Sequence, residues 1–275
     1  MILDAEAGRP QVVPHQTRDA MPQLIQISGV TKVFGRGASR VHAFGPVDLD
    51  IEAGRFVSLL GPSGCGKSTL MLMLAGLLDI TDGRIAIAGK QVAGPQTDIG
   101  IMFQDNTLVP WRTVRGNVEL QLEMRGMAPR DHAKRVMDLL KSVHLEDFAE
   151  RYPHELSGGM QQRAAFCQAM VHRPDIMLLD EPLGKLDAMT RERIRTDLQS
   201  LWMQERPTVL FVTHSIEEAV QLSTHVAVIT PRPGRIDRVI EIDLPFPRDL
   251  DVKNSPRFMQ HVREIQEIFR GFGVI

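Results

Sequence analysis

The sequence has no excess of charge of either sign, no long apolar run and few cysteines, and each absence excludes a class of protein. Its formal net charge of −2 gives no support for a nucleic-acid partner, because proteins that bind nucleic acid usually carry a basic patch. The longest apolar run, Leu70 to Leu78, is far shorter than the ~20 residues of a membrane-spanning helix. The opening stretch MILDAEAGRPQVV contains acids and lacks a long apolar core, so we expect no secretory signal. We predict a chain that does not span a membrane but can sit against one through a partner.

The two cysteines, Cys65 and Cys167, lie in or near the two glycine-containing motifs described below. A disulfide there would restrain loops that must bind a ligand, so we expect a reducing compartment. With 275 residues, of which 43% are hydrophobic, the chain is long enough to bury a substantial core. We therefore predict a soluble α/β protein with one domain, or with one domain and an appendage.

The strand pattern changes along the chain. Residues 1–22 are rich in Pro, Gly and polar side chains, which predicts a disordered tail. From Gln23 to about Gly54, two alternating runs flank the turn-like GRGAS and predict antiparallel strands. The later runs FVSLLG, IGIMFQ, IMLLDEP and TVLFVTH are apolar and end in polar residues, which predicts a parallel sheet buried on both faces. A fifth run, VAVIT, is followed by PRPGRI and predicts a small hairpin.

Helices are predicted between these strands, from Lys67, over about 131–143, after the Gly158-Gly159 pair and over about 189–204. Near the end of the chain, Ser255 is a suitable N-cap and Pro256 suits the first helical position. The helix that follows has an apolar stripe, which indicates packing rather than a binding surface. The stripe consists of Phe258, Val262, Ile265 and Phe269.

The stretch GPSGCGKST follows the first apolar run and matches the phosphate-binding pattern G-x-x-x-x-G-K-[ST]. In this pattern the glycines let backbone N–H groups close around phosphates, the lysine neutralises the outer two phosphates, and the serine hydroxyl coordinates Mg²⁺. A plain glycine-rich turn is the alternative, but the position between an apolar strand and an apolar helix argues against it. A serine-hydrolase elbow fails because Cys65 stands where its last glycine belongs. The predicted phosphate-binding residues are Gly61, Pro62, Ser63, Gly64, Cys65, Gly66, Lys67, Ser68 and Thr69.

Polar side chains follow the other apolar runs at the point where each strand ends. Because ligands of open parallel sheets bind beyond the carboxyl ends of the strands, we expect these side chains to converge with the phosphate loop. Asp180 is suited to hold the Mg²⁺ shell, and Glu181 is the candidate general base. Gln104 is expected to contact the γ-phosphate, the metal or its water, and His214 to orient the water beside Glu181. The alternatives are helix capping for the acidic pair, a solvated loop for Gln104 and a structural role for His214.

A second helix start that suits an anion is LSGGMQQR, from Leu156 to Arg163. With this stretch in place, the chain resembles the ATP-binding subunits of ABC transporters from about Leu24 onward, because LSGGMQQR is the signature of that family and precedes the LLDEP strand as expected. The resemblance also covers Gln104, Leu186-Asp187 and His214.

The resemblance implies an α/β fold of the P-loop NTPase, ABC ATPase type. A mainly parallel core sheet is expected to be joined by an N-terminal antiparallel β subdomain and by a helical subdomain over about 105–172. The ATPase domain would cover 23–250, after the tail at 1–22. Residues 251–275 would form a C-terminal helical extension.

The resemblance also implies a head-to-tail homodimer that binds ATP and Mg²⁺. In such a pair, Ser157, Gly158 and Gly159 cap ATP held by the phosphate loop of the opposite subunit, so the second anion site serves the partner's nucleotide. Three further residues are implied at the nucleotide or the dimer seam: Phe34 stacking on adenine, Gln161 of the signature, and Asp187. A buried core residue is the alternative for Phe34. Lys185 departs from the family pattern, which usually has a small residue there; we expect it to point to solvent.

Implied metal ligands are Ser68, Gln104 and Asp180, and the implied catalytic residues are Glu181, His214 and Gln104. Because NTLVPWRTVRGNV, PRPGRI and DAMTR resemble the nitrate, sulfonate and taurine import group, the chain is expected to power import of a small anionic or organic solute. Its partners would be transmembrane permease subunits and, indirectly, a periplasmic or extracellular substrate-binding protein. It would lie peripherally on the cytoplasmic face of the membrane.

Trp111 and Arg112 are expected in the groove that receives the permease, with a core tryptophan as the alternative. Two other functions are weighed. Relatives that act in translation or DNA repair have a second module or a long coiled coil, and this chain has neither. A nucleotide-sensing module without turnover is disfavoured because Lys67, Asp180, Glu181 and His214 are all present.

Overall fold

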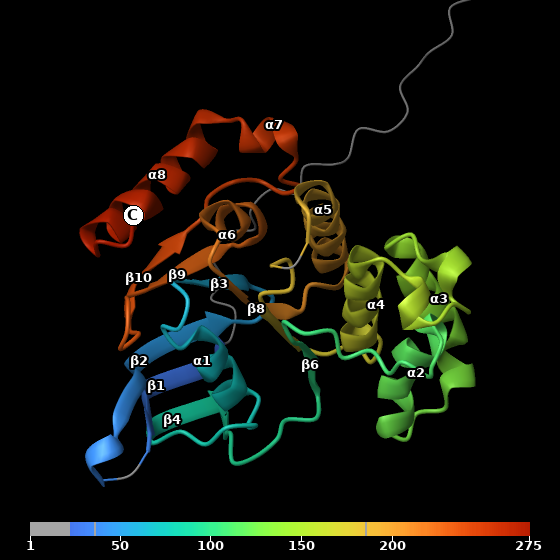
Figure 1. Ribbon diagram of the computed structural model, residues 1–275, viewed down its shortest axis with the longest axis horizontal. Coiled ribbons are helices and arrows are strands. Elements are labelled where there is room, and N and C mark those ends of the chain that lie inside the picture. The colour runs from blue at the N-terminus through green and yellow to red at the C-terminus, as the bar shows by residue number, and fades with distance from the viewer. Residues whose placement is uncertain (1–22, 36, 185) are drawn as a thin grey trace, which may run out of the picture.

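The computed structural model describes residues 23–35, 37–184 and 186–275. The predicted tail and the predicted solvent position of Lys185 therefore lie outside the described residues. Two sheets and the helices around them make up the described chain (Figure 1). The larger sheet occupies the centre, the antiparallel sheet lies at the lower left, and the helices α2, α3 and α4 gather at the right of the view.

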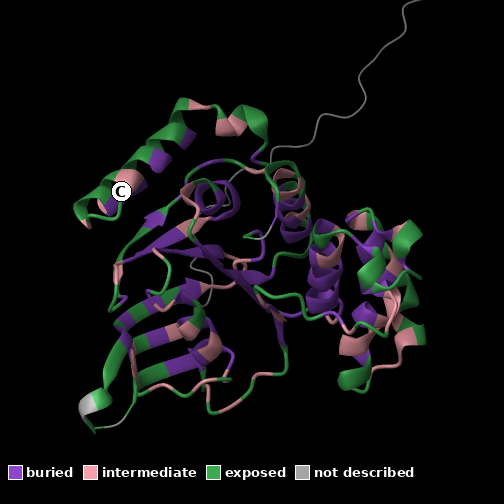
Figure 2. Cartoon of the chain, viewed as in Figure 1, coloured by how far each residue is buried: buried purple, intermediate pink, exposed green. Residues whose placement is uncertain are grey.

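The core sheet has six strands in the order β10-β9-β3-β8-β7-β6. The pairs β9–β3, β3–β8, β8–β7 and β7–β6 are parallel, and β10 runs antiparallel to β9 at one edge. Every residue of β3, β7 and β8 is buried, as the purple centre of Figure 2 shows, which confirms the parallel sheet that the apolar runs predict. The strands are β3 (Phe56–Leu60), β6 (Ile99–Met102), β7 (Ile176–Asp180), β8 (Thr208–Thr213), β9 (His225–Ile229) and β10 (Ile236–Glu241).

The second sheet is antiparallel and has the order β2-β1-β4-β5. The predicted pair of strands around GRGAS is confirmed as β1 and β2, and β4 and β5 add two strands that the sequence patterns did not indicate. Its strands are β1 (Gln23–Phe34), β2 (Val41–Glu52), β4 (Asp82–Ile87) and β5 (Lys90–Gln91). One inner face packs on α1, since Ile25, Ile27 and Leu70 belong to one hydrophobic cluster.

The helices are α1 (Lys67–Leu74), α2 (Val114–Met124), α3 (Ala133–Ser142), α4 (Gly158–Met170), α5 (Ala188–Glu205), α6 (Ile216–Leu222), α7 (Leu250–Lys253) and α8 (Pro256–Gly271). Short 3₁₀ turns are η1 (Gly37–Ser39), η2 (Pro129–His132), η3 (Glu146–Phe148) and η4 (Pro153–Glu155). The helix predicted over about 131–143 is therefore split into η2 and α3, and α2 and α6 were not predicted. Within the described part of the chain, each helix is too short or too polar to cross a bilayer.

Side-chain caps set the start of several helices. Ser157, Asp187 and Ser255 each accept a hydrogen bond from a backbone N–H in the first turn that follows. The last of these confirms the predicted start of α8. All four residues of its predicted stripe are buried in one cluster with α6, β9 and β10, which confirms that the stripe serves packing.

Candidate functional site

The phosphate-type loop connects β3 to α1 at the carboxyl end of the sheet. Gly64 and Gly66 adopt left-handed backbone conformations, with φ of 76° and 103°. At Gly66 a Cβ would lie 2.5 Å from Cδ2 of Phe44, so only glycine fits there. Lys67 is 4% exposed and bends back over the loop, where its Nζ donates to the carbonyls of Gly61 at 2.8 Å and Pro62 at 3.0 Å. The loop thus fixes one ammonium group beside a run of backbone N–H groups.

Cys65 takes part in this loop only through its backbone, because its side chain is buried under the turn. A Cβ on Gly61 would lie 3.1 Å from the Cys65 sulfur, so the thiol fills the space below the loop. Burial raises the pKa of the Cys65 thiol. A buried thiol with a raised pKa is a poor nucleophile.

Asp180 ends β7 directly opposite the start of α1. Its Oδ1 accepts a hydrogen bond of 2.8 Å from the Ser68 hydroxyl. Burial raises the pKa of Asp180, and the Ser68 hydrogen bond opposes that shift. A hydroxyl and a carboxylate oxygen at this separation are the hard oxygen donors that Mg²⁺ prefers, and Mg²⁺ commonly uses one or two protein ligands together with phosphate oxygens.

Glu181 has an unusual backbone for a non-glycine residue, with φ of 41°. Its N–H donates to the carbonyl of Val212 at 3.0 Å, and its own carbonyl accepts from Gly184 N–H at 3.2 Å. The carboxylate lies between two groups that the sequence also singled out: Oε1 is 3.9 Å from Lys67 Nζ, and Oε2 is 3.4 Å from His214 Nδ1. Neighbouring strands therefore hold this carboxylate in a strained, defined position.

These contacts join five predicted residues in one cluster: Lys67, Ser68, Asp180, Glu181 and His214. Helix capping does not explain the acidic pair, since Asp187 and not Asp180 or Glu181 caps α5. Half of the His214 side chain remains exposed, so the histidine is not a core residue.

Gln104 lies in the exposed loop after β6, next to the strand that ends in Asp180. Two residues further on, Asn106 Nδ2 donates to Gln161 Oε1 at 2.5 Å. The Gln161 amide also donates to the carbonyls of Pro153 and Leu156. Gln161 is therefore occupied in bracing the turn before α4 and in joining it to the loop that follows Gln104.

The two signature glycines have different surroundings. A Cβ at Gly158 would meet nothing within 4 Å, so the first turn of α4 is open to an approaching group. A Cβ at Gly159 would clash with the Thr190 methyl group of α5, which explains this glycine through packing within the chain. Ser157 Oγ accepts from Met160 N–H at 3.4 Å and caps the helix.

The signature stands apart from the phosphate loop of its own chain. In Figure 1, α4 lies among the helices at the right, whereas α1 lies at the left beside the antiparallel sheet. Across the described residues, no hydrogen bond or ion pair joins Ser157, Gly158 or Gly159 to residues 61–69. The two anion-seeking helix starts of one chain therefore form two separate surfaces.

Phe34 and Trp111 are both exposed, which makes the core alternative wrong for each. Phe34 is 43% exposed at the end of β1, with Lys32 Nζ 5.1 Å from its ring centroid. Trp111 is 77% exposed before α2. A hollow of about 390 Å³ does lie near α2, but neither Trp111 nor Arg112 lines it.

Asn117 is a residue that sequence reasoning missed. It is fully buried in α2, and its amide bonds to both backbone groups of Val109 and to the carbonyls of Arg112 and Thr113. The loop after Gln104 is shaped by this one side chain. The only signal in the sequence is a polar residue on the inner face of the helix that follows this loop.

Comparison with known proteins identifies the family to which this arrangement belongs. The sequence pattern described as "ABC transporter" matches residues 44–184. This chain belongs to the ABC transporter family. It is 45% identical over 235 residues to the taurine import ATP-binding protein of Rhizobium johnstonii, covering 83% of this chain and 89% of that protein. It is 42% identical over 233 residues to the aliphatic sulfonates import ATP-binding protein of Bacillus licheniformis, covering 85% and 89%.

Among solved structures, a dimeric ATP-binding cassette in a post-hydrolysis state with ADP and Pi has a TM-score of 0.70 to this structure. It is 33% identical, and the match covers 80% of this chain and 99% of the cassette. The expected ABC ATPase fold is therefore confirmed, and the chain is an ATP-binding subunit of the kind that hydrolyses ATP.

Proposed function

We propose that this chain is the ATPase subunit of an importer for a small organic solute of the sulfonate or taurine type. The observation that carries the proposal is the cluster at the carboxyl ends of β3, β7 and β8, where Lys67, Ser68, Asp180, Glu181 and His214 meet. The kind of solute is suggested by the relatives, which are named for taurine and aliphatic sulfonate import. The subunit would work at the cytoplasmic face of a membrane.

Each residue of the cluster has a distinct task in this proposal. Lys67 and the loop N–H groups bind the phosphates, and Ser68 with Asp180 would hold Mg²⁺, which stabilises charge on the transferred phosphoryl group when bound. Glu181 accepts a proton from the attacking water. His214 at 3.4 Å orients that carboxylate, and the strained backbone of Glu181 limits the directions in which it can point. Gln104, on the neighbouring loop, completes the metal and water contacts.

The reaction requires a second copy of the chain. The open N-terminal turn of α4 belongs to the helices at the right of Figure 1, apart from α1 and the phosphate loop of its own chain, and a helix N-terminus attracts negative charge. In a head-to-tail pair this turn would cap the ATP of the partner, while Asp187 and Phe34 would lie at the seam and at the adenine. A solved relative is dimeric, which supports this arrangement. ATP then joins the pair, and hydrolysis weakens it.

Replacing Glu181 by Gln tests the catalytic assignment. The amide keeps the size and hydrogen bonds of the side chain but cannot accept the proton, so ATP hydrolysis should fall on the order of 10²-fold or more while ATP binding persists. Phosphate release and fluorescent-nucleotide binding measure the two quantities. Glu267→Gln on the exposed side of α8 is the matched control. Turnover of Glu181→Gln within a few-fold of the unaltered chain would reject the assignment.

A permease subunit would dock in the hollow of about 390 Å³ between the core sheet and α2. Its lining is mainly apolar and includes Leu77, Phe103, Leu120 and Met124, with Arg125 as the one charged side chain. Met124 is 73% exposed at its rim although it is apolar, which is a feature of contact surfaces. A short apolar helix from the membrane subunit would cover this rim.

Met124→Glu tests this docking surface by placing a charge on an apolar contact. Co-purification with the membrane subunit should be lost, and nucleotide affinity should stay within twofold because the hollow shares no residue with the phosphate loop. Met259→Glu, on the exposed face of α8, is the control. Normal recovery of the complex with Met124→Glu would show that the permease binds elsewhere.

The cargo is selected by other subunits in this proposal. A substrate-binding protein outside the membrane and the permease bind the solute, and the near-neutral charge of this chain gives no reason to expect nucleic acid. Purifying the assembled transporter and screening its binding protein by thermal shift against sulfonates, taurine and nitrate would identify the solute. Stabilisation by a nucleic acid alone would overturn the import assignment.

A further inference from the structure

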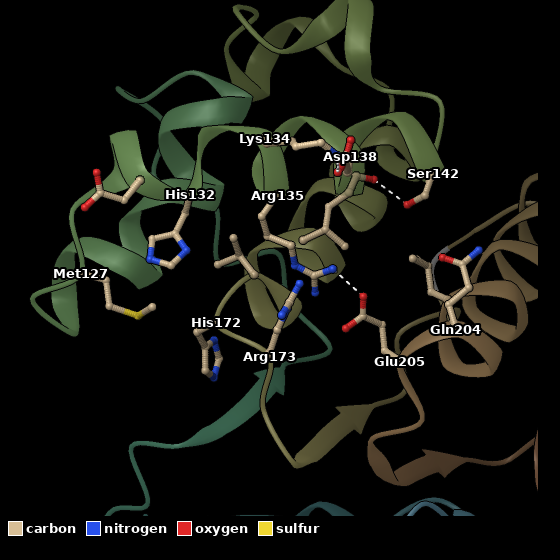
Figure 3. Close-up of a pocket in the computed structure, with 14 residues that line it drawn as sticks. Met127, His132, Lys134, Arg135, Asp138, Ser142, His172, Arg173, Gln204 and Glu205 are labelled. Atoms are coloured by element: carbon tan, nitrogen blue, oxygen red, sulfur yellow. Dashed lines mark hydrogen bonds and ion pairs between the residues drawn. The ribbon is translucent and has the colours of Figure 1, made fainter.

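A hollow of about 560 Å³ lies between α3 and the end of α5. One wall comes from η2 and α3, and the other comes from the end of α5 and the turn that follows α4 (Figure 3). None of residues 61–69, Asp180, Glu181 or His214 contributes to the lining. The volume is within the range of small-molecule sites, which is roughly 300–1,000 Å³. The hollow is thus separate from the site of ATP hydrolysis.

The charged side chains around this hollow are mostly paired with one another. Lys134 Nζ lies 2.7 Å from Asp138 Oδ2, and both are at the solvent-exposed rim. Arg135 donates to Glu205 Oε1 at 2.5 Å and to the carbonyl of Met170 at 3.1 Å. Within the described residues, one lining cation, Arg173, makes no ion pair at all.

The backbone of Arg173 is fixed, whereas its side chain is exposed. Its φ is 56°, a left-handed conformation that a residue with a side chain seldom adopts, and its N–H donates to the carbonyl of Met170 at 3.0 Å. Figure 3 shows its side chain reaching into the hollow toward the guanidinium of Arg135. The Met170 carbonyl therefore accepts hydrogen bonds from the Arg173 backbone and from the Arg135 side chain. The guanidinium groups of Arg135 and Arg173 face each other.

An anion between two nearby guanidinium groups is attracted by both and lowers their mutual repulsion. Glu205 compensates one of the two charges, because it pairs with Arg135 alone. His132 and His172 also line the hollow and add ring nitrogens near the same space. The free N–H groups of Arg173 form a planar fork that matches the paired oxygens of a sulfonate, sulfate, phosphate or carboxylate.

We propose that this hollow binds a small oxyanion, which Arg173 holds by paired hydrogen bonds and Arg135 by its charge. Arg135 belongs to α3, and Arg173 belongs to the turn that leads into β7. A bound anion would therefore join the helical region to the core. The proposal does not depend on the solute that the transporter carries.

Isothermal titration of the full chain with sulfate and with ethanesulfonate, at constant ionic strength, tests the site. Saturating Mg-ADP is present throughout, because the phosphate loop would otherwise bind the same anions. We expect saturable binding at one site. Binding of both probes assigns the site to organic oxyanions, and binding of sulfate alone assigns it to inorganic ones. Absence of saturable binding by either probe overturns the proposal.

Variants then locate the bound anion. Arg173→Gln should weaken binding about tenfold or more, since it removes charge-assisted hydrogen bonds. Arg173→Lys keeps the charge but loses the planar pair of N–H donors, so its affinity for the anion should lie between those of the unaltered chain and Arg173→Gln. Arg263→Gln is the matched control, because Arg263 is exposed on α8 and outside the lining. Equal weakening by Arg173→Gln and Arg263→Gln would show only a general effect of surface charge and would refute the site, provided that ADP affinity confirms the fold of both.

Discussion

Asn117 shows how one side chain can shape a functional loop. Its amide oxygen accepts from Val109 N–H at 2.6 Å, and its amide nitrogen donates to three carbonyls between 3.0 and 3.1 Å. A buried amide with all of these partners satisfied is stabilising, whereas the loss of the amide leaves several backbone groups without partners. These hydrogen bonds tie Val109, Arg112 and Thr113 of the loop to the first turns of α2.

Asn117→Ala should lower the free energy of unfolding by about 1–3 kcal/mol, the usual cost of leaving buried polar groups unpaired. Urea unfolding followed by circular dichroism measures the change. Asn254→Ala, at an exposed position after α7, is the control and should change it by less than about 0.5 kcal/mol. An equally small change for Asn117→Ala would mean that other contacts hold the loop.

At Glu181 the position of the side chain depends on a strained backbone conformation. The positive φ places its carboxylate between Lys67 and His214, and the neighbouring strand β8 compensates the strain through the Val212 carbonyl. No residue-by-residue pattern indicates a left-handed glutamate. The pattern LLDEP predicted the role of this residue but not its geometry.

Among the secondary-structure elements, α8 is attached to the rest of the protein by both apolar packing and an ionic cluster. Phe258, Val262 and Ile265 enter the cluster formed with α6 and β10. On the same helix, Arg257 donates two hydrogen bonds to Asp243, and His261 Nε2 lies 2.7 Å from Asp243 Oδ1. Asp243 follows β10, so its carboxylate ties the helix to the edge of the sheet.

Acid should loosen this attachment. The hydrogen bonds of Arg257, and then that of His261, hold the pKa of Asp243 well below its ordinary value of 3.8. A carboxyl group with a depressed pKa in the folded state contributes stability that is complete above pH 3.8 and is lost as the pH falls below it. Asp243→Asn should therefore lower stability at pH 7 and flatten its dependence on pH below about 4.

Thermal unfolding between pH 3 and pH 7 would check this, with Asp251→Asn on α7 as the control. If Asp243→Asn leaves the acid limb of the stability curve unchanged, the carboxylate does not hold α8. Hydrogen exchange of residues 256–271 would then show which other contacts do.

The complete protein works as a pair in our proposal, because each chain has two helix starts suited to bind an anion, and they lie on different surfaces. The open turn at Gly158 and the phosphate loop of the same chain make no contact among the described residues. In a head-to-tail pair, the α4 turn of each chain meets the phosphate loop of the other, which makes two equivalent sites. Such an arrangement couples the two sites, since neither is complete alone.

Ser157→Arg tests the pairing because it places a bulky cation at the surface that should meet the partner's ATP. ATP binding should be retained and hydrolysis lost on the order of 10²-fold, as for the removal of a transition-state contact. Light scattering should detect an ATP-dependent dimer of Glu181→Gln that the double variant with Ser157→Arg does not form. Ser200→Arg, at an exposed position of α5, is the control.

Mixing two inactive variants gives a stricter check of the same idea. Ser157→Arg has an intact phosphate loop, and Lys67→Ala has an intact signature, so a mixed pair contains one complete site. The mixture should recover hydrolysis that neither variant shows alone. Continued inactivity of the mixture, with both variants folded and able to associate, would mean that the site is completed within one chain.

Local spacing in the chain was sufficient to predict the phosphate loop, the strands β3, β7 and β8, the start of α8 and the acidic pair. These features depend on neighbouring residues: an apolar run must be buried, and glycines at fixed intervals permit a tight turn. The family signature LSGGMQQR also allowed the ABC ATPase fold to be predicted. By contrast, the helix at 114–124 and the strands β4 and β5 were missed because their residues form no clear apolar period and pack through contacts far along the chain.

The sequence predicted that the polar groups at the strand ends converge, and the tertiary structure determined which of them are in contact. The strand order β9-β3-β8-β7-β6 brings the ends of β3, β7 and β8 together although they are far apart in the sequence. The left-handed backbone of Glu181, the buried amide of Asn117 and the facing pair Arg135 and Arg173 all arise from long-range contacts. Sequence patterns predict local structure, because it depends on neighbouring residues. Distances between elements are set by packing of the whole core.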